Sequence, residues 1–511
     1  MSNWTGGYVA DIAYTHGYYP ELNPLRIRLA FLQSGHAIPA TGTACELGFG
    51  QGISTNLHAA ASVTRWYGTD FNPSQAGFAQ ELAAASGASA QLYDEAFAQF
   101  CARADLPDFD FIGLHGIWSW ISDENRGVIT DFIRRKLKVG GVVYISYNTQ
   151  PGWAAMAPLR DLLVEHSELM GVPGTGIVPR IDASLDFAER VFKSGALYGR
   201  ANPNVVGRLE ALKTQNRNYL AHEYFNRDWV PMSFSRIKGW LEEAKLSFAC
   251  SAHALDHVDA INLTPEQQQL LADVPDPMFR ETVRDFLVNS QFRRDYWVRG
   301  PRTLSVLERV ELLRKERFVL VAPRDTVTMT VTGTRGAAAM HEDVYLPILD
   351  ILQDHRIHTL HDIERALEGK ADLAGIMQAM LILVGKNAVN PVHDDAAIEA
   401  AARQCQRLNR RLCLQARYSD AVSALASPVT GGGVRVSRID QLLMLAHAEA
   451  PDNPVAWARF VLQVVHAQDQ RLLVEGKAPE SIEAELDEAR RQTLDFQARR
   501  LPIMKALRIQ L

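Results

Sequence analysis

A glycine-rich segment followed by an acidic residue carries the clearest chemical signal in the sequence. Residues 46–52 read Glu-Leu-Gly-Phe-Gly-Gln-Gly, directly after a short strand-like run and before a helix-compatible stretch at 54–62. Glycines at such a turn let the backbone bend sharply and approach a ligand closely. Asp70 stands eighteen residues after Gly52, at the end of the next expected strand. A carboxylate there can accept hydrogen bonds from both hydroxyls of a ribose.

The spacing of the glycines distinguishes between classes of cofactor. A nicotinamide or flavin fingerprint, G-x-G-x-x-G, would need glycine at position 53, where the chain has Ile53. The E-x-G-x-G-x-G form of residues 46–52 instead resembles motif I of the class I S-adenosylmethionine-dependent methyltransferases. This resemblance implies S-adenosylmethionine as the cofactor. The residues that the motif and the following strand assign to it are Glu46, Gly48, Gly50, Gly52 and Asp70.

The resemblance extends to residues at other strand ends. Asp94 matches the place where a polar side chain faces the adenine amino group, and its alternative is an exposed turn carboxylate. His115 follows the fourth expected strand, where such enzymes border methionine and substrate, but it could equally be a buried histidine with its hydrogen bonds satisfied. Tyr18, in the aromatic N-terminal segment, is a further expected cofactor contact.

Aromatic residues predict an acceptor pocket and the catalytic residues. Tyr147 and Trp153 come at the end of the fifth expected strand and just after it, and Trp118 follows the fourth. We expect the four N-terminal tyrosines, Tyr8, Tyr14, Tyr18 and Tyr19, to fold over Tyr147 and Trp153. An apolar pocket favours a neutral lysine amine, and ring faces attract a methylated ammonium product. For each aromatic residue the alternative is ordinary core packing.

The elements that must position these residues alternate between strand and helix over residues 43–147. This pattern predicts a Rossmann-like, doubly wound and mainly parallel α/β sheet. A helical stretch follows, and helix 233–244 with strand 246–249 is expected to return to the sheet. Three helical patterns near residues 344–384 resemble a winged helix. The expected division is a cofactor domain with an N-terminal lid (1–159), a helical insertion that could dimerise (160–220), the return to the sheet (221–255), a middle domain (256–335) and a winged-helix-like C-terminal domain (336–511).

Several segments resemble one bacterial family, the methyltransferases with a methyltransferase regulatory domain, typified by rickettsial protein-lysine methyltransferases. This resemblance implies a protein substrate methylated on a lysine nitrogen. Two alternatives remain open: methylation of a small molecule or glycan, and a cofactor-binding regulator without catalysis. The matching segments are 18–20, 23–24, 144–153, 222–226, 292–300, 426–430 and 436–438.

The composition of the chain argues against several kinds of partner and ligand. The 511 residues carry a net charge of −6, so we expect no nucleic-acid partner. The longest apolar run, 376–384, is far shorter than the ~20 residues that span a bilayer, and the first twenty residues lack the features of a secretory signal. Five scattered cysteines indicate neither disulfides nor a zinc site. Residues 222–226 begin like the zinc motif H-E-x-x-H, but Asn226 replaces its second histidine, so no metal is expected. We expect a cytoplasmic protein that could form a homodimer.

Overall fold

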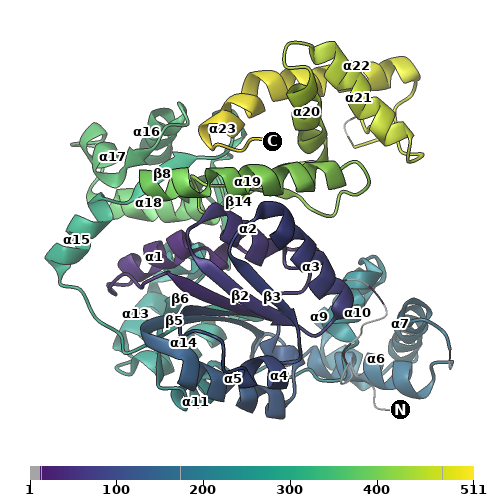
Figure 1. The fold of residues 1–511 in the computed structure, drawn as a ribbon. Coiled ribbons are helices and arrows are strands. Elements are labelled where there is room, and N and C mark those ends of the chain that lie inside the picture. Colours follow the sequence, from purple (N-terminus) through teal and green to yellow (C-terminus); the bar gives the residue numbers. More distant parts are fainter. Residues whose placement is uncertain (1–7, 9–11, 13, 173, 475) are drawn as a thin grey trace.

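A seven-stranded sheet forms the centre of the computed structural model, which describes residues 8, 12, 14–172, 174–474 and 476–511 (Figure 1). The strand order is β3-β2-β1-β4-β5-β7-β6, and the first five of these strands run parallel. The order reverses between β1 and β4, which makes their carboxyl ends the expected ligand crevice. The strands are β1 (Thr43–Leu47), β2 (Arg65–Asp70), β3 (Ala90–Asp94), β4 (Phe109–Leu114), β5 (Leu137–Asn148), β6 (Leu246–Ser251) and β7 (Phe292–Arg299).

Helices cover both faces of this sheet, and every residue of β1 and of β4 is buried. Continuous burial of this kind is typical of parallel strands with helices on both sides. The predicted Rossmann-like α/β class is therefore confirmed. The surrounding helices are α1 (Pro24–Gln33), α2 (Ile53–Ala61), α3 (Pro73–Ser86), α4 (Phe97–Ala102), α5 (Asp123–Lys136) and α11 (Phe234–Glu242).

The far edge of the sheet differs from the expected division of the chain. β6 lies in the sheet, as its pattern predicted, but it pairs only with β7, and β7 pairs with β5. The sequence analysis assigned β7 to a separate middle domain, and this part of the division is wrong. The run contains Arg293, Arg294 and Asp295, so it does not have the hydrophobic pattern of a buried strand. Arg293 nevertheless pairs inside the fold with Asp295, which makes its burial tolerable.

The insertion is helical, as expected, and has a core of its own. Trp153, Leu163, Ile181, Leu209 and Tyr224 lie in that core. The helices are α6 (Ala157–Leu169), α7 (Ile177–Lys193), α8 (Leu197–Ala201), α9 (Pro203–Lys213) and α10 (Arg217–Tyr224). The last of them, α10, leads back towards the end of the sheet that carries the crevice.

The C-terminal part divides between two cores, whereas the sequence analysis expected one domain. The first resembles a winged helix: α16 (Glu342–Leu352), α17 (Leu360–Ala366) and α18 (Leu373–Gly385) pack beside a small antiparallel sheet. That sheet has the order β11-β8-β12, and its central strand β8 precedes the three helices, unlike the wing of a winged helix. Its strands are β8 (Arg317–Leu320), β11 (His358–Thr359) and β12 (Val389–Pro391).

The second C-terminal core lies directly on the domain that is built around the seven-stranded sheet. Helix α19 (Asp395–Gln415) runs across α2 and α3 (Figure 1), and its Leu408 and Leu412 share a core with Ile53 and Leu57 of α2. The remaining elements there are the hairpin β13 (Ala424–Ser427) and β14 (Gly432–Arg435), with α20 (Arg438–Glu449), α21 (Pro454–His466), α22 (Ile482–Asp495) and α23 (Leu501–Ala506).

Four α-helices and strand β7 lie between β6 and β8: the helices are α12 (Asp259–Asn262), α13 (Pro265–Asp273), α14 (Pro277–Val288) and α15 (Val306–Arg314). A small hairpin of β9 (Thr330–Gly333) and β10 (Gly336–Ala339) follows β8. No helix among the described residues is both long enough and apolar enough to cross a bilayer.

Candidate functional site

The glycine turn between β1 and α2 has the conformation that a close ligand contact requires. Gly48, Gly50 and Gly52 have φ values of +72°, +58° and +67°, a region that other residues adopt only with strain. A Cβ atom on Gly48 would lie 2.6 Å from Cγ2 of Ile117. Glycine is therefore needed here both for the backbone angle and for space.

Two buried carboxylates flank this turn. Asp70, the last residue of β2, accepts a hydrogen bond from the Gly50 amide at 2.8 Å and one from the Asn72 amide at 3.0 Å. Burial raises the pKa of Asp70 to about 6, although both backbone bonds act in the opposite direction. Glu46 lies deeper, accepts a hydrogen bond from Thr55, and has a pKa raised by burial to about 8.

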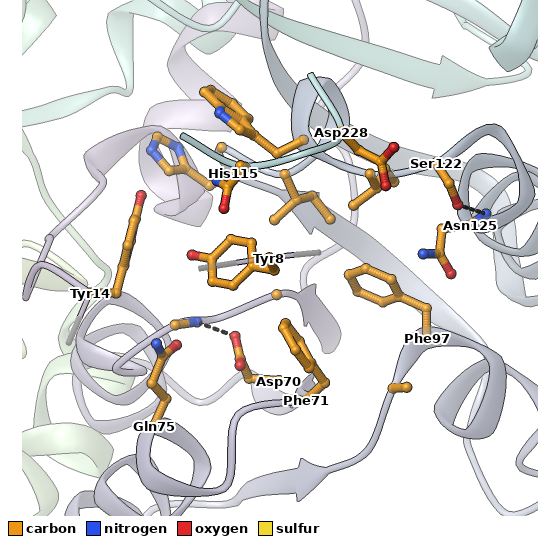
Figure 2. A pocket seen from close by; sticks show the side chains of 18 of the residues that line it. Tyr8, Tyr14, Asp70, Phe71, Gln75, Phe97, His115, Ser122, Asn125 and Asp228 are labelled. Atoms are coloured by element: carbon orange, nitrogen blue, oxygen red, sulfur yellow. Dashed lines mark hydrogen bonds between the residues drawn. The ribbon is translucent and has the colours of Figure 1, made fainter. Parts of the chain in front are cut away.

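A cavity of about 200 Å³ opens above the turn (Figure 2). Asp70 and Gln75 lie on one side of it and Phe97 and Asn125 on the other, with the Tyr8 ring between them. The other lining residues are Tyr14, Gly48, Gly50, Phe71, Glu95, Ala96, His115, Gly116, Ile117, Trp120, Ile121, Ser122, Asn226 and Asp228.

These residues fit S-adenosylmethionine. The Asp70 carboxylate stands where ribose hydroxyls can donate to it, and the glycine turn leaves backbone beside it without side chains. Apolar walls from Phe71, Phe97 and Ile117 suit the faces of an adenine. When bound, the cofactor supplies a methyl group already activated by a sulfonium.

His115 forms the wall between this cavity and the N-terminal segment. Its ring stacks on Tyr19 with a centroid distance of 3.4 Å, and its Nδ1 lies 2.9 Å from the hydroxyl oxygen of Tyr144. Burial lowers the pKa of His115 to about 4, so the ring is neutral at pH 7. The neighbouring Gly116 amide donates to Ser146, which fixes the turn after β4.

The structure gathers six of the predicted cofactor residues at this turn: Glu46, Gly48, Gly50, Gly52, Asp70 and His115 all line it. Two others lie elsewhere. Asp94 is exposed and outside the cavity, and the next residues, Glu95, Ala96 and Phe97, line the wall instead. Tyr18 packs against the C-terminal hairpin, where a Cβ on Gly433 would lie 2.9 Å from its ring. Tyr14 and Tyr19 take the position expected of Tyr18.

The three residues predicted to be catalytic lie in cores and line none of the cavities described here. Tyr147 is fully buried and donates its hydroxyl hydrogen to Asp295 at 2.7 Å. Trp153 packs edge-on against Trp229 in the insertion core, and Trp118 packs among the apolar side chains of the sheet. The expected pocket of Tyr147 and Trp153 under the N-terminal tyrosines is therefore not formed.

The reason is geometric. Side chains alternate along β5, and Tyr147 points to the face that α11 covers. Trp120, two residues after Trp118, reaches the cavity instead. Sequence reasoning also missed Asn226 and Asp228, which come from a distant segment and carry no motif that predicts their position.

Comparisons with known proteins agree with this geometry. A family model described as a predicted methyltransferase regulatory domain matches residues 216–299. The Synechocystis sp. protein sll1526 is 40% identical over 512 residues, covering 99% of each chain. The Rickettsia prowazekii protein RP789 is 29% identical over 199 residues, or 38% of this chain and 35% of that one.

A solved structure has the same overall fold. PKMT2 from Rickettsia typhi, in complex with AdoHcy, superposes with a TM-score of 0.68 and 16% identity, covering 97% of this chain and 100% of that one. The predicted resemblance and fold class are confirmed. The predicted enzyme class and cofactor, a methyltransferase with S-adenosylmethionine, agree with this fold and with the family model.

The segment matched by the family model is part of the methyltransferase-like domain. Residues 216–299 contain α10, α11, β6 and β7, so they complete the central sheet. The same segment provides Asn226 and Asp228 to the cavity.

Proposed function

The chain belongs to the same family as the Synechocystis protein sll1526, and we propose that it transfers the methyl group of S-adenosylmethionine to a lysine nitrogen of a protein. The observation that carries the proposal is the left-handed glycine turn with Asp70 beside it, at the point where the strand order reverses. In open α/β sheets this is where nucleotide-like ligands bind.

The residues of the cavity divide the work of binding and alignment. Asp70 accepts hydrogen bonds from the ribose hydroxyls, and Phe71 and Phe97 enclose the base. The glycines of the turn, which have no side chains, let the cofactor approach the protein backbone. Tyr14 and His115 exclude water from the side at which an acceptor would approach. Methyl transfer needs little more than alignment of nucleophile, methyl carbon and sulfur in a dry site.

Three observations support a protein as the substrate. The related fold is that of PKMT2, and the sequence segments noted above resemble protein-lysine methyltransferases. Roughly 360 residues lie outside a minimal methyltransferase core of about 150, enough to recognise a macromolecule. A homodimer and a cytoplasmic location stay predictions.

Transfer of label from the cofactor tests the proposal. Purified protein is incubated with a bacterial lysate and S-adenosylmethionine that carries a tritiated methyl group. We expect label in protein bands that survives mild base, as N-methyl groups do and carboxyl methyl esters do not, and that appears in methyl-lysine after hydrolysis. Gly50→Val is the control without cofactor binding. Label only in small molecules, or no label despite normal binding of S-adenosylhomocysteine, would contradict the proposal.

A further inference from the structure

A second cavity, of about 210 Å³, adjoins the cofactor cavity. Tyr14 and His115 line both, so the two spaces meet at these side chains. Figure 2 shows Tyr14 and His115 at the same end of the cofactor cavity. The second cavity is enclosed by the N-terminal segment, the end of β4 and helix α10. Its lining residues are Tyr14, Thr15, Tyr19, His115, Tyr219, His222 and Glu223.

The walls of this cavity are aromatic, and Glu223 is the one carboxylate among the lining residues that the structure describes. The Tyr14 ring meets the His222 ring edge-on at 5.0 Å, and the Tyr19 ring lies flat on His115. Tyr219 is 39% exposed and Thr15 is also exposed, so the cavity reaches the surface at one end. At its other end it reaches the cofactor cavity.

Glu223 has no counterion among the described residues. Burial alone raises its pKa to about 7. Two other buried carboxylates are paired with arginine, Glu316 with Arg28 and Glu485 with Arg471. Asp70 and Glu46 instead accept hydrogen bonds, from backbone amides and from Thr55. A partly buried carboxylate without such a partner is costly, and it favours a cation that enters from outside.

We propose that this second cavity is the acceptor site and that the Glu223 carboxylate binds the ammonium group of the substrate lysine and takes its proton. The proposal rests on the function proposed above and specifies its acceptor. The carboxylate supplies the attraction, and the surrounding rings supply faces that stabilise a cation within about 6 Å. Both features favour a cation over an anionic carboxylate or an uncharged hydroxyl.

The chemistry balances as one proton transfer and one methyl transfer. An N–H bond of the ammonium breaks and its proton passes to a Glu223 oxygen, which leaves a neutral amine and a carboxylic acid in an apolar space. The amine lone pair forms a bond to the methyl carbon while the carbon–sulfur bond breaks and its electron pair stays on sulfur. The methylated nitrogen leaves as an ammonium ion, and Glu223 later releases its proton to water.

The groups that face Glu223 fix the direction of the pH dependence. They are the phenols of Tyr8, Tyr14, Tyr19 and Tyr219, whose pKa values are all raised, and the rings of His115 and His222. No arginine or lysine is among the described lining residues. Cation binding therefore needs ionised Glu223 and should weaken as the pH falls below about 7.

A small amine tests the site without knowledge of the substrate. n-Butylammonium is titrated calorimetrically into protein saturated with S-adenosylhomocysteine, with n-butanol as the neutral probe. The variants are Glu223→Gln and, as a matched control, Glu165→Gln on the exposed surface of α6. At pH 8 we expect the wild type and Glu165→Gln to bind butylammonium alike, and Glu223→Gln to bind it at least about tenfold more weakly.

Further readouts separate a failed site from a failed fold or function. Affinity for S-adenosylhomocysteine should stay unchanged in Glu223→Gln, and Tyr219→Ala, at the rim, should weaken butylammonium several-fold. Absence of butylammonium binding in the wild type, equal binding in Glu223→Gln, or equal binding of butanol would overturn the proposal. If Glu223→Gln also labels lysate proteins at the wild-type rate, the acceptor site is wrong while the proposed function stands. If the wild type labels no protein, the proposed function fails whatever the amine does.

Discussion

Replacing Asp70 by asparagine should strengthen the fold while it weakens cofactor binding. Burial raises the pKa of Asp70 from its ordinary value of 3.8 to about 6. At about 1.4 kcal/mol for each pH unit, keeping this carboxylate ionised in the folded protein costs about 3 kcal/mol at pH 8. Asparagine removes that cost. It also replaces one of the two oxygens that accept from Gly50 and Asn72, a loss of about 1 kcal/mol.

The pH dependence follows from the sign of the shift. Because the pKa of Asp70 is higher in the folded state, its contribution to stability is fully present below pH 3.8 and is lost as the pH rises through 6. The variant should therefore be more stable than the wild type by about 2 kcal/mol at pH 8. Between pH 8 and pH 5 the wild type regains about 1.4 kcal/mol, so the difference shrinks to less than about 1 kcal/mol.

Binding should change in the opposite direction. An ionised carboxylate that accepts from ribose hydroxyls contributes about 1–3 kcal/mol more than a neutral amide, which predicts a 5- to 150-fold loss of affinity for S-adenosylhomocysteine at pH 8. Scanning calorimetry at both pH values measures stability, and titration calorimetry measures binding. A variant that gains stability yet binds normally would mean that Asp70 does not contact the ribose. A variant that loses stability at pH 8 would refute the electrostatic reasoning.

Three further substitutions separate the turn, the insertion core and the sheet edge. Gly50→Val should reduce the affinity for S-adenosylhomocysteine at least about 100-fold, because residue 50 has a positive φ and the added Cβ would lie 3.2 Å from the Tyr14 ring. Gly77→Val is the control, since a Cβ there meets open space, and it should bind normally in the same calorimetric titration. Trp153→Ala should lower the free energy of unfolding by about 3–5 kcal/mol in urea denaturation, because it leaves a cavity in the insertion core, while the folded variant binds S-adenosylhomocysteine normally. A loss of turnover without a loss of stability would instead support the catalytic role expected from the sequence. Arg293→Met should lower the free energy of unfolding by about 3–5 kcal/mol, because it leaves buried carboxylates without their cation. Arg134→Met removes an exposed ion pair and should lower it by less than about 1 kcal/mol. Equal losses of stability in the two variants during denaturation would contradict this difference.

The parts of the fold that sequence predicts are those with local signals. The expected strands 43–47, 64–70, 91–94 and 109–115 match β1 to β4 within about a residue, because short apolar runs ended by turn residues specify parallel strands. The glycine turn is predictable for the same reason. The positive φ angles of this turn are ones that glycine adopts readily, so the glycines themselves signal it in the sequence.

Side-chain direction at a strand end is not specified locally. Asp94 was expected to face the adenine, yet the chain leaves β3 in such a way that its side chain points to solvent and Phe97 points inward. Tyr147 lies at the correct end of β5, but its side chain is buried in the core under α11 and its hydroxyl donates to Asp295, so it does not line the cavity. A shift of one position in an alternating strand exchanges the two faces, and the sequence pattern of a strand buried on both faces does not distinguish between them.

Long-range pairing accounts for the other differences. β7 was missed because its charges pair with residues of α14 and with each other, which only the folded structure brings together: Arg293 lies 2.8 Å from Asp285 and 3.0 Å from Asp295. In the sequence, Glu223 belonged to a failed zinc motif and to a segment that resembles the family, and neither assigned it a role. Its position beside Tyr14 depends on the return of α10 across about two hundred residues of chain, for which the sequence carries no signal.

Glu223 and strand β7 belong to one segment, residues 216–299, and this segment is an integral part of the domain around the central sheet. The segment places Glu223 at the cavity through α10 and closes the sheet through β7 and β6. Asp295 of β7 joins the two halves of this arrangement, since it accepts from Tyr147 of β5 and from Arg293 at the same time. Without the segment, β5 would become an open edge strand with a buried tyrosine lacking its acceptor, which favours association between chains. Tyr147, expected as a catalytic residue, instead links β5 to β7 through its hydrogen bond to Asp295.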